Sequence, residues 1–271
     1  MSKCSAYLIH SKANLYTYFA YSFEMWGFVL FGLFQIILSI CVWISFFASS
    51  GATSINGFTL EEMIQYVFIS QMVILISANN ADNMISSDIS SGNIVYSLMR
   101  PQSYILGKLF NQVGHLMFHF VFVIIPFWFL LSFIGKLQFN IDPASIERIF
   151  ITLLSAFLSF FLSFFINIFI GLIAFKLMNN EGVLRIKSVI IMFLSGGLIP
   201  ISYFPDSMKS IVINLPFASM VSVPTNIYLG KYNSTNILDV LLLQVTWVIV
   251  FIISSFTLYI FSIRRLSVNG S

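Results

Sequence analysis

His115 and His119 are the clearest candidates for chemistry in this sequence. A spacing of four places both imidazoles on one face of a helix, where two of them can ligate a metal ion. A catalytic zinc helix of the H-E-x-x-H type needs glutamate directly after the first histidine, and Leu116 stands there. Because neither Glu nor Cys accompanies the pair, we interpret both histidines as helix-packing residues or as a lipid-headgroup contact. The sequence predicts no metal site.

The acidic residues at the outer ends of the helices fit helix capping better than an acidic ring at an outer mouth. Thr59 and Glu62 have the spacing of a capping box. Asp142 before Pro143 has the pattern of an N-cap followed by proline at the first helical position. An intramembrane protease of the CAAX type would need E-E-x-x-x-R, and the chain has tyrosine at the arginine position after its only Glu-Glu pair. Catalysis by these acids is therefore not predicted.

The sequence lacks a phosphate-binding loop of the G-x-x-x-x-G-K-[ST] type. The Gly-Lys pairs at Gly107 and Gly230 have Gln102 and Thr225 where the first glycine is required. We therefore expect this chain to bind no ATP or other cofactor itself, and not to be an enzyme on its own.

The composition indicates an integral membrane protein. The chain of 271 residues is 58% hydrophobic and only 8% charged, whereas soluble domains carry roughly 25% charged residues. Its mean hydropathy is +0.94. The net charge of +3 is too small to indicate a nucleic-acid partner.

Intervals without charged residues locate the membrane spans. They cover residues 25–60, 63–81, 110–135, 149–175, 188–205, 210–230 and 240–263. A spanning helix needs about 20 mostly apolar residues, and Pro216 and Pro224 cut 210–230 into shorter pieces. We therefore predict an all-α membrane protein, a single domain over 1–271, with six transmembrane helices. Within these spans, Gln35, Asn167 and Gln244 are expected to bond across helices or to touch a translocated molecule, since intramembrane polar groups usually face a bundle interior.

The positive-inside rule orients the six spans. With both termini cytoplasmic, the inside segments hold nine basic residues and the outside segments four. The inside set is Lys3, Lys12, Arg100, Lys108, Lys176, Arg185, Lys187, Arg264 and Arg265. Residues 3–22 mix tyrosines with basic residues and are predicted to form an amphipathic helix in contact with lipid of the inner leaflet.

A polar segment with helical spacing, residues 83–101, follows the second span. Isoleucines and a leucine recur at steps of four or five, and Ser, Asp and Asn fill most positions between them. A helix with this pattern has one apolar and one polar side. Arg100-Pro101 then gives a positive flank and a helix stop. The segment is either a connector lying on the membrane surface or a helix that is offered to a soluble partner.

The fifth span is irregular, because Ser195-Gly196-Gly197 and Pro200 interrupt it. Such breaks persist at membrane depth only where protein or a water cavity covers the freed backbone groups. The proline-containing stretch 206–230 follows, and we predict that its helical fragments re-enter the outer leaflet.

Together these features resemble the permease subunits of ABC-2-type transporters. The resemblance covers about residues 3–265 and rests on three features. These are the six-span order, SSGNIVYSLMRPQSY after the second span, and GGLIPISYFPDSMKSIVINLPFASMVSVPTNIYLGK before the sixth. It implies that 83–101 is a coupling helix and that 206–230 is a re-entrant outer segment. One departure is Ser90-Ser91, which stand where this family often has a charged residue before the glycine.

The resemblance implies that this chain works with a separate ATP-binding cassette ATPase, which holds ATP and Mg²⁺. Two permease chains, identical or paralogous, would pair around a central route in the bacterial cytoplasmic membrane. The coupling role falls on Asp88, Gly92, Ile94, Leu98, Arg100 and Pro101. We expect the second and fifth spans to line the seam between the two chains. The expected seam residues are Gln71, Asn79, Phe193, Gly196, Gly197, Pro200 and Ile201.

The expected activity is export of a hydrophobic or amphipathic cargo, such as a drug, a lipid or an antimicrobial peptide. The spans offer mostly Phe, Leu and Ile with a few amides, and no cluster of charges that would select an ion. The alternative is an ion-coupled secondary transporter of a small hydrophobic solute. That class uses buried ionisable groups and internal repeats, and the spans show neither apart from the two histidines.

Overall fold

The computed structural model describes residues 7, 11–12, 16, 22–99, 102–125, 143–177, 180–232 and 234–269. Within these residues the regular secondary structure is helical except for one short hairpin. The helices are α2 (Ser22–Ser50), α3 (Leu60–Ser77), α4 (Ala81–Ser90), α5 (Ile94–Leu98), α6 (Tyr104–His119), α8 (Pro143–Leu172), α9 (Glu181–Leu194), α10 (Asp206–Val212), α11 (Ser222–Tyr228) and α12 (Ser234–Asn269). A π-helical turn, η1 (Phe120–Ile124), extends α6, and two 3-10 turns are η2 (Ile173–Phe175) and η3 (Ile201–Tyr203).

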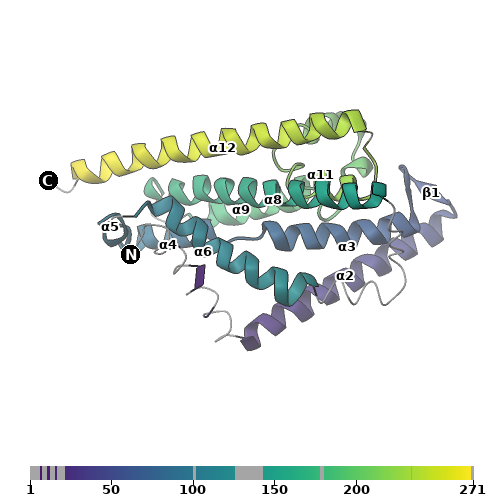
Figure 1. The fold of residues 1–271 in the computed structure, drawn as a ribbon, viewed down its shortest axis with the longest axis horizontal. Helices are drawn as coiled ribbons and strands as arrows, with labels where there is room; N and C mark the ends of the chain where they lie inside the picture. The colour runs from purple at the N-terminus through teal and green to yellow at the C-terminus, as the bar shows by residue number, and fades with distance from the viewer. Residues whose placement is uncertain are drawn as a thin grey trace.

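Helix α8 lies at the centre of the bundle. It packs against α12, α4, α11 and α3, and Figure 1 shows α12 running along one side of it and the α3–α4 rod along the other. Phe160, Phe164 and Leu162 are at most 1% exposed. The short helix α5 lies at the same end of the bundle as the C-terminal end of α12, and the hairpin lies at the opposite end (Figure 1).

Four stretches of the described chain are long and apolar enough to cross a membrane: Leu30–Ser50, Leu60–Ser90, Ile146–Phe175 and Asn236–Arg264. These confirm the predicted first, second, fourth and sixth spans. The predicted third span is described only to residue 125. The predicted fifth span corresponds to α9, whose 14 residues are fewer than the roughly 20 that a continuous crossing requires. Helix α9 ends at the predicted Ser-Gly-Gly interruption.

The structure corrects the prediction of one continuous helix over 83–101. Helix α4 ends at Ser90 and α5 starts at Ile94. Between them Gly92 has φ +73°, a left-handed conformation that costs an L-residue roughly 1–2 kcal/mol and that ends the helix. Arg100 and Pro101, the expected stop, lie outside the described residues.

The hairpin end of the bundle also differs from the all-α prediction. Strands β1 (Ser54–Ile55) and β2 (Phe58–Thr59) pair antiparallel. Asn56 and Gly57 both have positive φ, as an Asn-Gly hairpin turn requires. The predicted capping box is confirmed, because the Thr59 hydroxyl accepts from the Glu62 amide at 3.3 Å and the Glu62 carboxylate accepts from the Thr59 amide at 2.9 Å. Asp142, the other predicted cap, lies outside the described residues.

The segment after α9 packs firmly against the bundle. In α11, Thr225 and Ile227 are fully buried, and the helix lies against α8 and α3. The Ser222 amide donates to the Ser195 carbonyl at 2.9 Å. The hydroxyl of Tyr66 in α3 donates to the Gly196 carbonyl at 2.6 Å. Protein groups thus satisfy the backbone that the Ser-Gly-Gly interruption frees.

Candidate functional site

A cavity of about 370 Å³ lies between α2, α3, α8 and α9. We call it the central cavity. Three of the predicted seam residues, Gln71, Asn79 and Gly197, line it. The other predicted seam residues are not among its lining. Phe193 is 51% exposed, whereas Gly196 and Pro200 are buried, and Ile201 packs with Val212 and Ala218.

The polar floor of the central cavity is built on the break between α3 and α4. The amide nitrogen of Asn167 in α8 donates to the Asn79 carbonyl at 3.1 Å and to the Asn79 side-chain oxygen at 2.7 Å. The Asn79 amide nitrogen donates to the Ser163 hydroxyl at 3.0 Å, and the Asn80 backbone amide donates to Gln112 at 3.3 Å. Side chains thus replace the helical bonds that residues 78–80 lose, as membrane depth requires.

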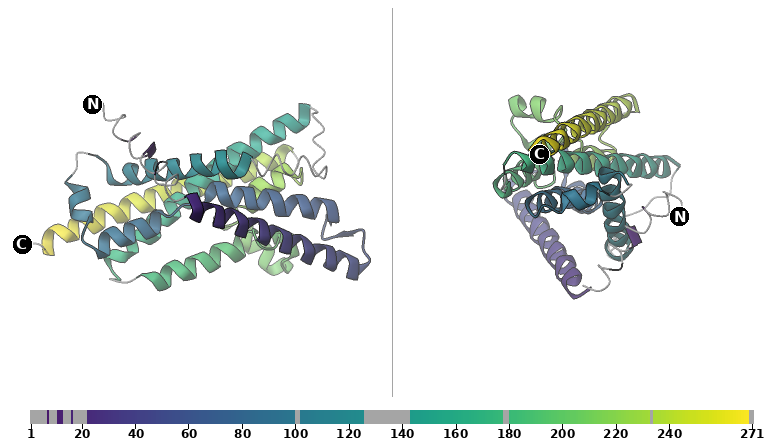
Figure 2. Two further views of the ribbon diagram at one scale, coloured as in Figure 1. Left: turned by 90° about the horizontal axis from the view of Figure 1, so that it is seen from below. Right: turned by 90° about the vertical axis from the view of Figure 1, so that its left-hand side faces the viewer.

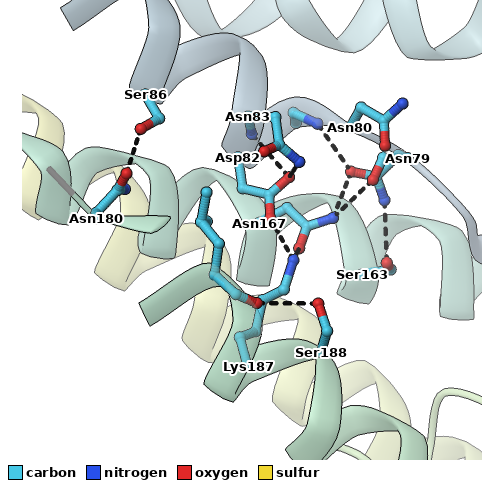
Figure 3. Close-up of polar contacts among 12 residues, drawn as sticks. Asn79, Asn80, Asp82, Asn83, Ser86, Ser163, Asn167, Asn180, Lys187 and Ser188 are labelled. Carbon is cyan, nitrogen blue, oxygen red and sulfur yellow. Dashed lines mark hydrogen bonds and ion pairs between the residues drawn. The ribbon is translucent and has the colours of Figure 1, made fainter. Parts of the chain in front are cut away.

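Next to this floor, Asp82 in α4 and Lys187 in α9 form a buried ion pair (Figure 3). Their side chains are 2% and 13% exposed. The Lys187 ammonium also donates to the Asn167 side-chain oxygen at 2.7 Å, and the Asp82 carboxylate accepts from the Asn83 backbone amide at 2.8 Å. Asp82 lies in the first turn of α4, where the helix dipole favours a negative charge. The pair joins the segment after the second span to α9.

The sequence analysis missed this ion pair. Asp82 and Lys187 stand one residue outside two charge-free intervals, 63–81 and 188–205, and Lys187 was assigned to a cytoplasmic segment. Helix rise places Asp82 roughly 33 Å from Leu60, close to the inner boundary of a hydrocarbon core about 30 Å thick. A signal for the pair was present in the sequence. Asp82 follows the first interval and Lys187 precedes the second, so two opposite charges lie on the same predicted side of the membrane.

Gly171 in α8 lets α4 approach closely enough to form this pair. A Cβ added at Gly171 would lie 3.0 Å from both the Cα and the carbonyl oxygen of Asp82, and 3.1 Å from the Cβ of Ile85. Most of these atoms are backbone and have little room to move. A second link between α4 and the start of α9 is the hydrogen bond from the Ser86 hydroxyl to the Asn180 side-chain oxygen (Figure 3).

The predicted coupling residues divide into buried and exposed groups. Ile94 is 2% exposed and packs in the cluster of Ile85, Phe164 and Ile168, and Leu98 lies against the same cluster. The exposed side chains are instead Val95, Tyr96 and Met99, at 52%, 70% and 78%. Gly92 forms the turn before α5. Helix α5 is thus anchored by one face and presents the other to its surroundings.

Asp88 supports the base of this segment. Its carboxylate pairs with Lys108 in α6 at 2.7 Å and accepts a hydrogen bond from the Tyr104 hydroxyl at 2.8 Å. Burial, together with the hydrogen bond to Asp88, raises the pKa of Tyr104 above its usual value. The phenol therefore keeps its proton and remains a donor to Asp88 at physiological pH.

Two further sets of predicted polar residues lie within the bundle. His115 and His119 are both 8% exposed, with ring centroids 4.1 Å apart. Within the part of the chain that the structure describes, no group of three His, Cys, Asp or Glu side chains could hold a metal ion. The predicted cross-helix role is confirmed for Asn167, whose side-chain oxygen accepts from Lys187 of α9 at 2.7 Å, and for Gln244, whose side-chain oxygen accepts from the Ser155 hydroxyl of α8 at 2.9 Å. Gln35 shows no such bond to a described residue.

Comparison with protein-family models matches residues 33–270 to the family described as "ABC-2 family transporter protein". The match covers the whole segment from α3 to α12 and all but the first three residues of the Leu30–Ser50 span. No curated protein and no solved structure matches the chain.

Proposed function

The chain belongs to the ABC-2 transporter family, and from this premise we propose that it is the permease subunit of an ATP-driven exporter. It is a multi-pass membrane protein, and its family implies an ATP-binding cassette ATPase as partner. The proposal adds a direction and a cargo class: a hydrophobic or amphipathic molecule moves outward across the bacterial cytoplasmic membrane, in which both termini of the chain are cytoplasmic. ATP and Mg²⁺ belong to the ATPase, and two permease chains, identical or paralogous, form the route.

The observation that carries the proposal is the exposed apolar surface of α5. Val95, Tyr96 and Met99 project from a helix whose other face is fixed in the core by Ile94. Aromatic and methionine side chains are enriched at protein–protein contacts, and a rigidly anchored helix can transmit a push from a docked protein. The preceding helix, α4, carries Asp82 and so connects α5 to the central cavity through Lys187 and Asn167.

In this scheme, ATPase closure displaces α5 and α4 together, because both belong to the cluster that contains Ile85 and Ile94. The displacement changes the floor of the central cavity, where Asn79 and Asp82 flank the break before α4. In this scheme the segment 83–101 couples the ATPase to the permease through two helices. Helix α5 contacts the ATPase, and α4 transmits the movement. The segment 206–230 closes the outer side.

The test is site-directed crosslinking to the co-purified ATPase in a background without Cys4 and Cys41. Cysteines at Ser91 and Tyr96 should crosslink to the ATPase, and matched cysteines on the exposed side of α9, at Glu181 and Arg185, should not. Tyr96→Asp should lower cargo-stimulated ATP hydrolysis without changing the amount of permease in the membrane. Crosslinking at Glu181 and Arg185 alone would move the ATPase contact to α9, and failure of any ATPase to co-purify would refute the proposed function.

One observation in the structure favours the alternative of an ion-coupled transporter, namely the buried ion pair of Asp82 and Lys187. Ion-coupled transporters place ionisable groups of this kind on their ion pathways. The two mechanisms differ in their energy source. In proteoliposomes that contain permease and ATPase, export that needs ATP and persists after a protonophore and a sodium ionophore collapse the ion gradients supports the proposal. Export that a gradient drives without ATP supports the alternative.

A further inference from the structure

Three polar side chains on the α2 and α3 walls of the central cavity have no hydrogen-bond partner among the described residues. Gln35 and Ser39 on α2 and Gln71 on α3 all line the cavity, and none of these side chains makes a hydrogen bond to another described residue. Gln35 is exposed, and Ser39 and Gln71 are half-buried. Two other amides of the same cavity, Asn79 and Asn167, already bond to each other, whereas the side chain of Asn80, which also lines the cavity, makes no hydrogen bond to a described residue.

The depth of these three side chains makes their lack of partners informative. Along its helix, Gln71 lies roughly 16 Å from Leu60, and Ser39 and Gln35 lie roughly 16 and 22 Å from Ser50. With a hydrocarbon core about 30 Å thick, Gln71 and Ser39 are near its middle and Gln35 lies in its inner half. An amide or hydroxyl at this depth without a hydrogen bond is unfavourable, because little water is present to replace the missing partner. A ligand that accepts and donates hydrogen bonds would remove this cost.

The charge balance of the cavity excludes ionic ligands. Lys187 is the one ionised residue among the described lining residues, and its ammonium is already bonded to the Asp82 carboxylate and to Asn167. A carboxylate or ammonium ligand would therefore enter a cavity without a free opposite charge, and an unpaired buried charge is far more costly than a neutral polar group. Each glutamine, by contrast, offers two N–H donors and one carbonyl acceptor.

The size and walls of the cavity define the rest of the ligand. Ile74, Ile191 and Leu198 provide apolar surface beside the polar groups. The volume of about 370 Å³ is at the small end of the roughly 300–1,000 Å³ typical of small-molecule sites. It is too small for a helix of a second chain. These features describe a small polar head attached to an apolar chain.

We propose that the central cavity binds the uncharged, hydrogen-bonding headgroup of an amphiphile, an amide or hydroxyl head, through Gln35, Ser39 and Gln71. The proposal rests on the proposed function in one respect, since it takes this ligand to be the exported cargo. Lipids with a hydroxyl head and free amphiphiles with an amide head share the required chemistry. Binding itself needs no ATPase, so it can be measured on the permease alone.

The test is photolabelling of the purified full-length permease in phosphatidylcholine nanodiscs. The probes are N-dodecanoyl-glycinamide, which is neutral, and N-dodecanoyl-glycine, which is anionic, with a diazirine at the same chain carbon. The neutral probe should label peptides that contain Gln35 or Gln71 at least fivefold more than the anionic probe. Gln71→Leu should reduce this labelling about fivefold, since it removes hydrogen bonds worth about 1 kcal/mol. Gln71→Asn, which keeps the amide, should restore most of it.

Gln65→Leu is the matched control, because Gln65 lies on the same helix and is not part of the cavity lining. Equal loss of labelling in Gln65→Leu and Gln71→Leu would overturn the assignment, and so would equal labelling by the anionic probe. Excess unlabelled dioleoylglycerol and excess unlabelled N-dodecanoyl-glycinamide compete in separate arms. If either competitor displaces the probe, the proposal of a neutral headgroup is supported, and the effective competitor identifies its source as a membrane lipid or a free amphiphile. If neither competitor displaces the probe, the proposal is refuted. Loss of ATPase co-purification with intact labelling would refute only the proposed function.

Discussion

Separating Asp82 from Lys187 should destabilise the protein far more than separating an exposed pair. Asp82→Asn leaves the Lys187 ammonium, 13% exposed, with the Asn167 oxygen as its remaining partner. Removal of one partner from a buried pair typically costs about 3–5 kcal/mol, which corresponds to a hundredfold or greater change in the unfolding equilibrium. Lys187→Met should cost less, about 2 kcal/mol, because the Asp82 carboxylate keeps the Asn83 amide as donor.

The double variant should reveal the interaction between the two charges. Asp82→Asn combined with Lys187→Met removes both charges, so neither is left unpaired. Its destabilisation should be smaller than the sum of the single effects by about 2 kcal/mol. The Glu181–Arg185 pair on the same α9 is the matched control, because its atoms are 3.9 Å apart and its side chains are 74% and 84% exposed. Its coupling should be below about 0.5 kcal/mol.

Steric trapping in bilayers measures these unfolding free energies reversibly, with biotin tags placed at two exposed positions and monovalent streptavidin as the trap. All four variants of each pair are measured at one lipid composition. If the Asp82 and Lys187 effects add to within about 0.5 kcal/mol, the two charges do not stabilise each other, and the link between α4 and α9 inferred from the structure is incorrect.

Three other predictions concern close packing and buried polar contacts. Gly171→Val should separate α4 from α8, lower the stability by about 2 kcal/mol, and weaken the Asp82–Lys187 coupling in the same steric-trapping cycle; an unchanged coupling would contradict the close approach. Gly92→Ala should lower the free energy of unfolding by about 1 kcal/mol, because Gly92 has a φ of +73°. Crosslinking of a cysteine at Tyr96 to the ATPase should fall in the same variant. Full crosslinking would show that the turn at Gly92 does not position α5. Gln244→Leu should cost about 2 kcal/mol because it leaves the Ser155 hydroxyl without its acceptor and removes one of two donors to the Ser219 carbonyl, which keeps the Ser159 hydroxyl. The effect is measured as a loss of folded protein in detergent, and the exposed Thr246→Val in α12 should have little effect.

The sequence predicted features that depend on local patterns. The four long apolar stretches and the Thr59–Glu62 capping box follow from residue types at fixed short spacings, and the structure contains them. The Ser195-Gly196-Gly197 break ends α9 because glycines there adopt turn conformations, with φ +80° at Gly196. The Asn56-Gly57 hairpin was overlooked although an Asn-Gly pair is itself a local signal.

Features that depend on contacts between distant segments could not be predicted in this way. Asp82 and Lys187 are 105 positions apart, and only the approach of α4 to α8 at Gly171 and of α9 to α8 brings their charges together. The pattern of 83–101 correctly showed two faces. It did not show that the face with Ile94 turns into the core and that Tyr96 is exposed, because tertiary packing decides which apolar residues of a short helix are buried.

The bonds between α3, α4 and α9 have a consequence for how the bundle can move. Tyr66 in the first half of α3 is bonded to Gly196 just after α9, and Asp82 of α4 is paired with Lys187 in the middle of α9. Helix α2 packs on α3 through apolar groups such as Ile36, no hydrogen bond joins the described side chains of the two helices, and Figure 2 shows α2 at the edge of the bundle. Sliding of α2 along this apolar contact with α3 would break no hydrogen bond. We therefore expect α2 to be the side of the central cavity that moves most easily. The proposed amphiphile would therefore pass sideways between bilayer and cavity past α2, without breaking the hydrogen bonds that join α3, α4 and α9.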